Sequence, residues 1–374
     1  MHIYIWQRMI TPHMVGLAIG LASNHDLKIT YVAEEKMSAD RANQGWQTPS
    51  LGDVDVEFAP TELHAKDIAF NVSSDSIHIC QGIRANGVIG SAQRVLSKRG
   101  LNQWIIMETI DDSELGGFFK RSLYQYLFWS KRNQFRGILA VGHETKKWII
   151  SRGVKESKVY PFAYFLSDSI ISNLESKNSK KIFQFIFVGR LVKLKCVDLL
   201  IRALASLKGY DFELVVIGDG PCKESLYRDA NNLLPGKVKW LGQISMMEVH
   251  QKIAKAHCLV LPSRYDGWGA TVSEALMAGT PSICSSACGS SEVVKYSDKG
   301  GVFQSGNIED LTYNLENVLK AGALCLDDRI NLARWAKCLG GNSGANYLLE
   351  IFSWVDNNKL KPEAPWIKTL LKSL

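Results

Sequence analysis

Two carboxylates stand eight positions apart within residues 263–281, and their surroundings are those of a ligand-binding turn. Asp266 precedes two glycines, and Glu274 lies in a helix expected to start near Ala270 and end at Gly279. Free N–H groups at a helix start bind anions such as phosphate, and carboxylates accept hydrogen bonds from sugar or ribose hydroxyls. An ordinary loop–helix junction, with an acid favoured by the helix dipole, explains the same residues equally well.

A second candidate element follows the apolar run 182–188. Gly189 and Arg190 come directly after it, and Lys195 follows before the next helical stretch. Arginine offers a planar fork and lysine a point charge, and together they suit a diphosphate. Taken alone, the two cations fit a solvated surface loop just as well.

Both elements lie between a short apolar run and a helical pattern. The expected strands are 182–188, 212–217, 257–261 and 281–285 in the second half, and 3–5, 29–33, 76–80, 104–107 and 138–141 in the first half. Buried strands that alternate with helices indicate parallel sheets covered on both faces. The predicted fold class is therefore α/β, with two Rossmann-like, doubly wound domains facing a cleft, and ligands are expected at the carboxyl ends of the strands.

The predicted domain boundaries follow the composition. Residues 1–164 form an N-terminal domain, 180–345 a C-terminal domain, and 346–374 a helical segment that packs across their junction. The Ser-, Asn- and Lys-rich stretch that follows Pro161 is expected to be the linker.

Composition excludes several classes of protein. The chain has 374 residues, 46% hydrophobic and 22% charged, with a formal net charge of +7. This profile is that of a globular protein, and the excess of positive charge is too small to indicate nucleic-acid binding. No apolar run is long enough to span a bilayer, and the eight cysteines form no Cys-x-x-Cys pair. A cytoplasmic location follows, with peripheral contact to the inner face of the cytoplasmic membrane as an option.

Together the two elements make the chain resemble family 4 of the retaining glycosyltransferases, which have the GT-B architecture. That family carries a Gly-Arg-Leu-x4-Lys phosphate loop, or a close spacing variant, and a Glu-x7-Glu motif. Gly189-Arg190-Leu191-x3-Lys195 and Asp266-x7-Glu274 are similar to them, as is the turn 218–221. The resemblance covers residues 180–320 well and the first 160 residues only in general layout.

The resemblance implies a role for each matching residue. Arg190 and Lys195 would neutralise the diphosphate of a nucleotide sugar, Asp266 would accept from the donor-sugar hydroxyls, and Glu274 would bind the ribose. The implied donor-binding set is completed by Gly189, Gly267, Trp268, Gly269 and Ala270. No cofactor or metal is implied beyond the nucleotide-sugar co-substrate, and Asp53 and Asp55, although spaced like a metal motif of another transferase fold, suit a solvated turn.

The chain departs from the family pattern at three places. The first acid is Asp266 rather than glutamate, the glycine pair after the first strand is missing, and Glu108 stands where a histidine is usual. No general base is therefore assigned. The candidates His13, His78, Glu108 and His143 are each expected to be structural.

The segment 118–136 is both basic and aromatic, with five basic residues, seven aromatics and no acid. As a helix, it is expected to gather Tyr124, Phe128 and Phe135 on an outward face and to turn Phe119, Tyr126 and Trp129 toward the core. An aromatic face edged with cations suits an anionic membrane surface, whereas a helix with a solvated basic rim is the plain alternative. The candidate contacts are Lys120, Arg121, Tyr124, Phe128, Lys131 and Arg132.

The sequence thus predicts a retaining glycosyltransferase that moves a sugar from a UDP-, GDP- or dTDP-linked donor to a glycan or lipid-linked acceptor, in bacterial surface polysaccharide or lipopolysaccharide synthesis. Two alternatives stay open. One is a nucleotide-sugar epimerase on the same fold, which would form an epimer without any acceptor. The other is a catalytically silent subunit that binds sugar nucleotides.

Overall fold

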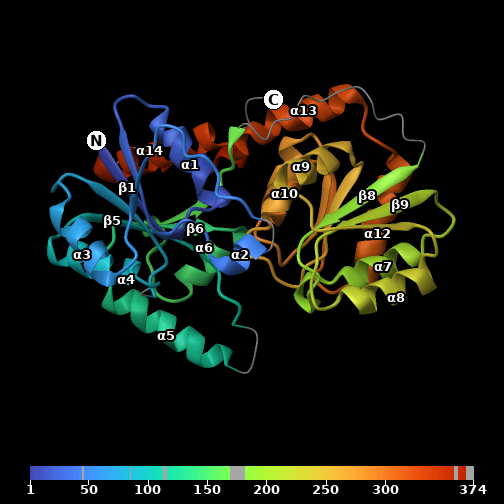
Figure 1. The fold of residues 1–374 in the computed structure, drawn as a ribbon, viewed down its shortest axis with the longest axis horizontal. Helices are drawn as coiled ribbons and strands as arrows, with labels where there is room; N and C mark the ends of the chain where they lie inside the picture. Colours follow the sequence, from blue (N-terminus) through green and yellow to red (C-terminus); the bar gives the residue numbers. More distant parts are fainter. Residues whose placement is uncertain (44–45, 85, 113–115, 169–181, 358–360, 368–374) are drawn as a thin grey trace. The chain divides into compact units, whose positions relative to one another are not determined.

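The computed structural model describes residues 1–43, 46–84, 86–112, 116–168, 182–357 and 361–367 (Figure 1). The chain divides into two compact units. Unit 1 comprises residues 1–43, 47–168 and 339–365, and unit 2 comprises residues 44–46, 169–338 and 366–374. The chain therefore returns to unit 1 after residue 338, rather than staying in the C-terminal domain up to residue 345 as expected.

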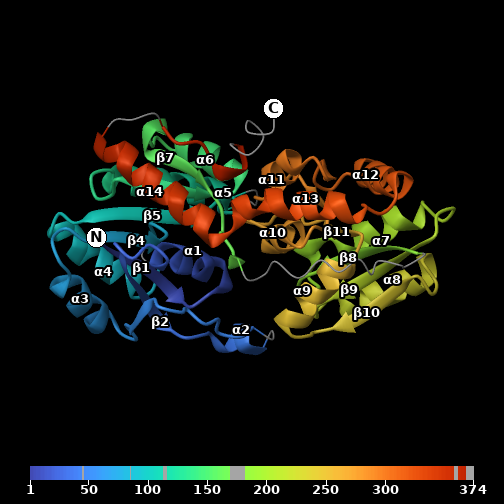
Figure 2. The ribbon, with the colours of Figure 1, turned by 90° about the horizontal axis from the view of Figure 1, so that it is seen from above.

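Unit 1 is built on a parallel sheet with strand order β3-β2-β1-β4-β5-β6-β7. Its strands are β1 (His2–Met9), β2 (Lys28–Glu35), β3 (Asp55–Phe58), β4 (Ile77–Gln81), β5 (Asn102–Glu108), β6 (Gly137–Val141) and β7 (Val159–Phe162). Its helices are α1 (Pro12–Ala22), α2 (Ala39–Asn43), α3 (Glu62–Asn71), α4 (Ile89–Lys98), α5 (Gly117–Ser130), α6 (His143–Ile150) and α14 (Gly341–Asn357). Figures 1 and 2 show α1 and α14 side by side.

The contact between α1 and α14 explains why the chain returns to unit 1. A Cβ on Gly20 would lie 2.2 Å from the carbonyl oxygen of Gly341, and one on Gly16 would lie 2.3 Å from the carbonyl carbon of Leu166. The backbones meet without side chains between them, which brings α14 close against α1. The backbone of Leu166 also exchanges hydrogen bonds with Leu339 and Gly341.

Unit 2 contains a second parallel sheet, with strand order β10-β9-β8-β11-β12-β13. Its strands are β8 (Phe183–Val188), β9 (Phe212–Ile217), β10 (Val238–Gly242), β11 (Cys258–Leu261), β12 (Ser282–Ser285) and β13 (Gly300–Phe303). Its helices are α7 (Val197–Ala205), α8 (Lys223–Leu233), α9 (Met246–Lys255), α10 (Ala270–Met277), α11 (Ser291–Ser297), α12 (Ile308–Ala321) and α13 (Leu326–Ala336). Figure 1 shows α7, α8 and α12 on one face of the sheet and α9, α10 and α13 on the other.

The two doubly wound parallel sheets confirm the predicted fold class, and every expected strand is present within a few residues of its predicted ends. The sequence analysis missed the strands at both edges of each sheet: β3, β7, β10 and β13. These strands are short, and β3 is exposed at every position. Pro161, just before the expected linker, lies inside β7, where an edge strand tolerates the missing N–H. Residues 169–180 of the expected linker lie outside the described residues.

The predicted faces of α5 are reversed in the structure. Tyr124 and Phe128, expected to face outward, are only 4% and 2% exposed and pack on Trp148 of α6. Tyr126 and Trp129, assigned to the core together with Phe119, are about 60% exposed. The prediction failed because both faces carry aromatic residues, so the hydrophobic pattern did not show which one covers the sheet.

Within the described ranges, no helix is long and apolar enough to cross a membrane. Nor does any group of three or more His, Cys, Asp or Glu side chains in this part of the chain have the geometry of a metal site.

Candidate functional site

The strand order of unit 2 places a topological switch point between β8 and β11. From β8 the chain proceeds to β9 and β10 on one side, and then crosses to β11, β12 and β13 on the other. The loops after β8 and β11 therefore lead to helices on opposite faces of the sheet, α7 and α10. Such loops leave a crevice at the carboxyl ends of the strands, where ligands of open α/β sheets bind. Both sequence motifs lie on these two loops.

The first loop is supported from the neighbouring strand. The N–H of Gly189 donates to the carbonyl of Ile217, and the N–H of Leu191 donates to that of Asp219. A Cβ on Gly218 would lie 1.9 Å from the carbonyl oxygen of Gly189, and one on Gly220 would lie 2.5 Å from that of Leu191. The turn after β9 therefore needs glycine so that the loop after β8, residues 189–196, can lie directly on it. We call residues 189–196 the basic loop.

A single turn of 3₁₀ helix, Lys193–Lys195, ends this loop, and Cys196 follows in the left-handed region with a φ of 51°. For a residue other than glycine this conformation is strained. The left-handed conformation of Cys196 turns the chain so that α7 starts at Val197, two residues after Lys195. Arg190, at the other end of the loop, is exposed, and its guanidinium forms no ion pair with the described residues.

The second loop meets the first through an ion pair. The Nζ of Lys195 lies 2.5 Å from the Oδ2 of Asp266, and the two side chains are only 22% and 17% exposed. The backbones meet as well, because the N–H of Arg264 donates to the carbonyl of Leu194 over 2.9 Å. The structure thus brings together the two motifs, which lie about 70 residues apart in the sequence.

The loop after β12, residues 286–290, holds the loop after β11, residues 262–269, in place. We call residues 262–269 the acidic loop. Asp266 forms an isolated parallel bridge with Cys288, in which its N–H donates to the carbonyl of Ala287 and its carbonyl accepts from the N–H of Gly289. The N–H of Ser290 donates to the carbonyl of Trp268. These bonds fix the backbone on which Asp266 is mounted.

Helix α10 starts at this point without a side-chain cap. Its N-cap is Gly269, with a φ of 83°, and a Cβ there would lie 2.8 Å from Leu261 and 3.1 Å from the Oγ of Ser290. The first N–H groups of α10, beginning with Ala270, are therefore not bound by an N-cap side chain. This end of a helix carries partial positive charge and suits an anion.

Glu274 projects from α10 about one turn further on and is 12% exposed. Its Oε2 lies 3.9 Å from the Nε2 of His250 on α9. The sequence analysis missed His250, and no motif signals it, because only the packing of α9 against α10 brings it to this carboxylate.

Trp268 contributes its backbone rather than its ring to this edge of the sheet. Its side chain is 2% exposed, donates to the Oγ of Ser273 and packs on Trp366, 6.3 Å away between centroids. Trp366 in turn donates to Glu292. The C-terminal segment thus supplies residues to unit 2 as well as to unit 1.

Two of the general-base candidates of unit 1 follow neighbouring strands: Glu108 ends β5 and pairs with Val141 of β6, and His143 begins α6 after β6. His78 is fully buried between Trp6 and Ser76, and burial lowers its pKa to about 3. His13 stacks on Tyr164, and His143 lies 3.1 Å from the neighbouring Glu144. His78 is therefore a neutral core residue, which agrees with the expectation that it is structural.

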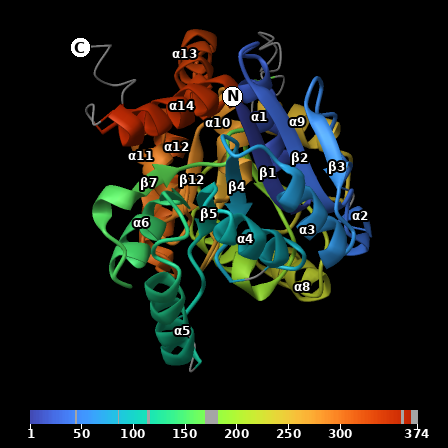
Figure 3. The same ribbon diagram turned by 90° about the vertical axis from the view of Figure 1, so that its left-hand side faces the viewer.

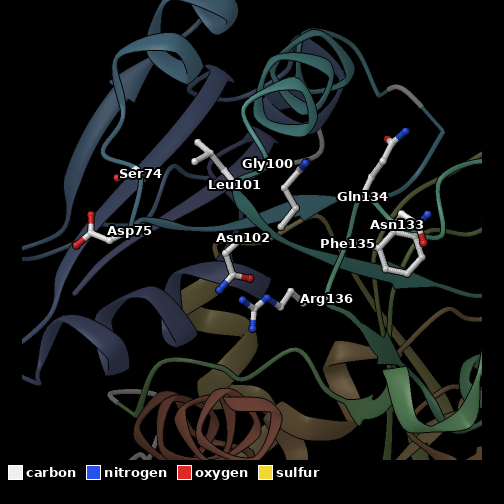
Figure 4. A pocket seen from close by; sticks show the side chains of 10 residues that line it. Ser74, Asp75, Gly100, Leu101, Asn102, Asn133, Gln134, Phe135 and Arg136 are labelled. Carbon is white, nitrogen blue, oxygen red and sulfur yellow. The ribbon is translucent and has the colours of Figure 1, made fainter.

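A pocket of about 350 Å³ lies in unit 1 (Figure 4). Its lining includes Asn102 at the start of β5 and Arg136 just before β6, and Arg136 is paired with Asp356 of α14 over 2.8 Å. The pocket therefore lies at the amino ends of these strands, opposite the edge at which ligands of such sheets bind. It is not a candidate for the site described above.

Comparison with known proteins points to glycosyltransferases. Residues 170–334 match the family model "Glycosyl transferases group 1". The lipopolysaccharide 1,6-galactosyltransferase of Escherichia coli is 30% identical over 178 residues, which is 46% of this chain and 48% of that protein. The chain spans between 22% and 48% of the length of the first curated relatives that it matches.

Two solved structures share the whole fold. Anabaena Alr3699/HepE in complex with UDP has a TM-score of 0.73 at 15% identity, and the match covers 94% of this chain and all of that one. The apo lipopolysaccharide outer core galactosyltransferase WaaB has a TM-score of 0.69 at 18% identity, covering 93% and 99%. The chain therefore has the GT-B fold, and its residues 170–334 match the group 1 glycosyltransferases.

Proposed function

We propose that the chain is a glycosyltransferase that moves a sugar from a nucleotide-sugar donor bound in unit 2 to a glycan or lipid-linked acceptor. The observation that carries this proposal is the ion pair between Lys195 and Asp266 across the switch point. A cation and a carboxylate lie side by side there, at the edge where open α/β sheets bind ligands, and this supports binding of a phosphate and of sugar hydroxyls.

The donor phosphates would lie between the first turn of α10 and the two cations, Arg190 and Lys195. Departure of the nucleoside diphosphate builds negative charge on its terminal phosphate, and preorganised cations stabilise that charge. The N–H groups that follow Gly269 add hydrogen bonds without needing to reorganise. Because these groups supply positive charge, we propose that transfer needs no metal.

The two carboxylates would hold the sugar and the ribose. Asp266 accepts from the donor-sugar hydroxyls, and Glu274 accepts from the ribose hydroxyls. Asp266 is one methylene shorter than the glutamate of the family motif, so the sugar must lie closer to the backbone of the acidic loop. We further propose that transfer retains the anomeric configuration, as in the family that the two motifs resemble.

Unit 1 would bind the acceptor at its own switch point, between β1 and β4. The N–H of Arg8 donates to Gln81 there, and the Arg8 guanidinium lies 3.6 Å from Glu34. These polar groups suit a hydroxylated acceptor. The relative that transfers galactose in lipopolysaccharide, and the neighbour that binds UDP, favour a UDP-sugar donor and a surface polysaccharide or lipopolysaccharide product.

Product analysis tests the proposal. The chain is incubated with UDP-sugars, with and without a lipopolysaccharide-core acceptor, and the products are identified by mass spectrometry and proton NMR. We expect a glycosylated acceptor and free UDP, with the anomeric configuration of the donor. An epimerised sugar nucleotide formed without acceptor would instead identify an epimerase, and binding without turnover would identify a silent subunit.

A further inference from the structure

The outward face of α5 is the largest run of exposed aromatic side chains on one helix of the described chain. Its apolar residues are Phe118, Phe119, Leu123, Tyr126 and Trp129, which are 65%, 76%, 38%, 60% and 62% exposed. At about 100° per residue they fall within an arc of about 140°. We call this set the α5 face. Exposed apolar patches of this kind mark surfaces that bind something.

Cations border the α5 face on both edges. On the helical projection, Lys120 lies at one edge and Arg121 at the other, and Arg132 follows just after the end of the helix. The guanidinium of Arg132 stacks over the Trp129 ring, 5.1 Å from its centroid. The segment from Phe118 to Arg136 contains no acid.

Asp112, the nearest described carboxylate before α5, already pairs with a cation outside this helix. Asp112 pairs with Arg152, accepts a hydrogen bond from Trp148 over 3.2 Å and lies 4.0 Å from Arg121. Positive charge at the rim of the α5 face therefore lacks an acidic counterpart on the helix itself.

The inner side of α5 fixes the direction of this face. Tyr124 and Phe128 pack edge-on against Trp148, with centroids 5.2 and 6.3 Å away. Lys131 reaches under the helix and donates to the carbonyl of Ile83. The helix is thus formed and oriented before it binds anything, so binding does not have to order it. Figure 3 shows α5 at the periphery of unit 1.

We propose that the α5 face binds the surface of an anionic lipid bilayer, with the helix lying in the interface plane. Its aromatic side chains enter the headgroup region, where Trp and Tyr are favoured, and the flanking cations contact lipid phosphates. The charge favours this occupant over a second copy of the chain, because pairing two such faces would bring like charges together. The proposal does not depend on the transfer reaction.

Vesicle binding by the full chain tests this inference. Co-sedimentation is measured with vesicles of phosphatidylcholine alone and with phosphatidylglycerol added. The test variant is Phe119→Ser with Trp129→Ser. The matched control is Leu63→Ser with Phe70→Ser on α3, where both side chains are 66% and 69% exposed and the helix carries Glu62 and Asp67.

We expect the chain to bind the anionic vesicles and to release as salt rises. The α5 variant should bind at least about tenfold more weakly, because it loses two of the interfacial aromatics, while the α3 variant binds like the unaltered chain. Circular dichroism of each variant verifies that the fold is intact.

Equal binding to neutral and anionic vesicles, or unchanged binding by the α5 variant, would overturn the proposal. A concentration-dependent dimer that the α5 variant loses, without vesicle binding, would assign the face to a second copy instead. Nucleotide binding in unit 2 reports on the proposed function separately, since α5 supplies no residue to that unit.

Discussion

The two sheets of the chain share one architecture, but their switch points differ in chemistry. In unit 2, the loops after β8 and β11 meet in the ion pair of Lys195 and Asp266, with both side chains mostly buried. In unit 1, the ends of β1 and β4 meet through a hydrogen bond from the N–H of Arg8 to the side-chain oxygen of Gln81, and the Arg8 guanidinium, paired with Glu34, is 54% exposed.

The difference matches what each proposed ligand would require. A diphosphate carries fixed charge, so its site needs cations held in place before it arrives. The groups at the unit 1 edge include an Arg8–Glu34 ion pair that is more exposed, and they suit the hydroxylated acceptor proposed there. A motif visible in sequence is therefore expected in unit 2, where charge dictates the residue types.

Replacing either partner of the ion pair should give the largest effects. The two replacements should change UDP binding in opposite directions. Lys195→Ala removes a phosphate cation and leaves Asp266 unpaired beside the phosphates, so we expect transfer to fall by about 10²–10³-fold and UDP binding to weaken. Asp266→Asn frees Lys195 for the phosphate. UDP should then bind as tightly or more tightly, while transfer is lost.

Isothermal titration with UDP, beside turnover measurements on both variants, checks this contrast. Arg8→Ala in unit 1 serves as the control and should leave UDP binding unchanged. Equal losses of UDP binding in Lys195→Ala and Asp266→Asn would refute the proposal that Lys195 binds the phosphates and Asp266 the sugar.

Replacing a glycine in the turn beneath the basic loop should give the next largest effect. In Gly218→Ala the new Cβ would meet the carbonyl of Gly189, so the loop must move, and we expect UDP to bind at least about tenfold more weakly. Gly209→Ala is the matched control, because no atom lies within 4 Å of a Cβ built there. Similar UDP affinities for the two variants would show that the position of the loop does not matter.

Lowering the pH should reduce the stability of unit 1, because His78 is buried as a neutral residue. Its pKa of about 3 in the folded chain is below the ordinary value of 6.5, so the unfolded chain binds the proton more tightly. The stabilisation is complete above about pH 6.5 and declines as pH falls toward 3, by about 2 kcal/mol at pH 5.

Urea unfolding at pH 7 and pH 5 measures this loss in the unaltered chain and in His78→Gln. The variant should lose about 2 kcal/mol less between the two pH values. The same pH dependence in both chains would mean that His78 is not the group that titrates.

The sequence predicted more of the site in unit 2 than of the surface of unit 1. Lys195 and Asp266 were assigned to one edge because each follows an apolar strand, and strand ends of a parallel sheet share an edge. Their direct pairing, and the approach of His250 to Glu274, depend on strand order and helix packing, which no local pattern encodes. Helix α5 shows the same limit: Tyr124 and Trp129 are equally aromatic, and only the fold decides which one is buried.

The most direct test of the central claim is calorimetric titration of UDP, GDP, dTDP and ADP into the unaltered chain and into Arg190→Ala. Arg190 is exposed and free among the described residues, so its removal should leave the fold intact. We expect selective binding of one nucleotide, with UDP favoured, that weakens at least about tenfold in the variant. Tight binding that is unaffected by Arg190→Ala and by Lys195→Ala would contradict it, because the phosphates would then lie away from the unit 2 switch point.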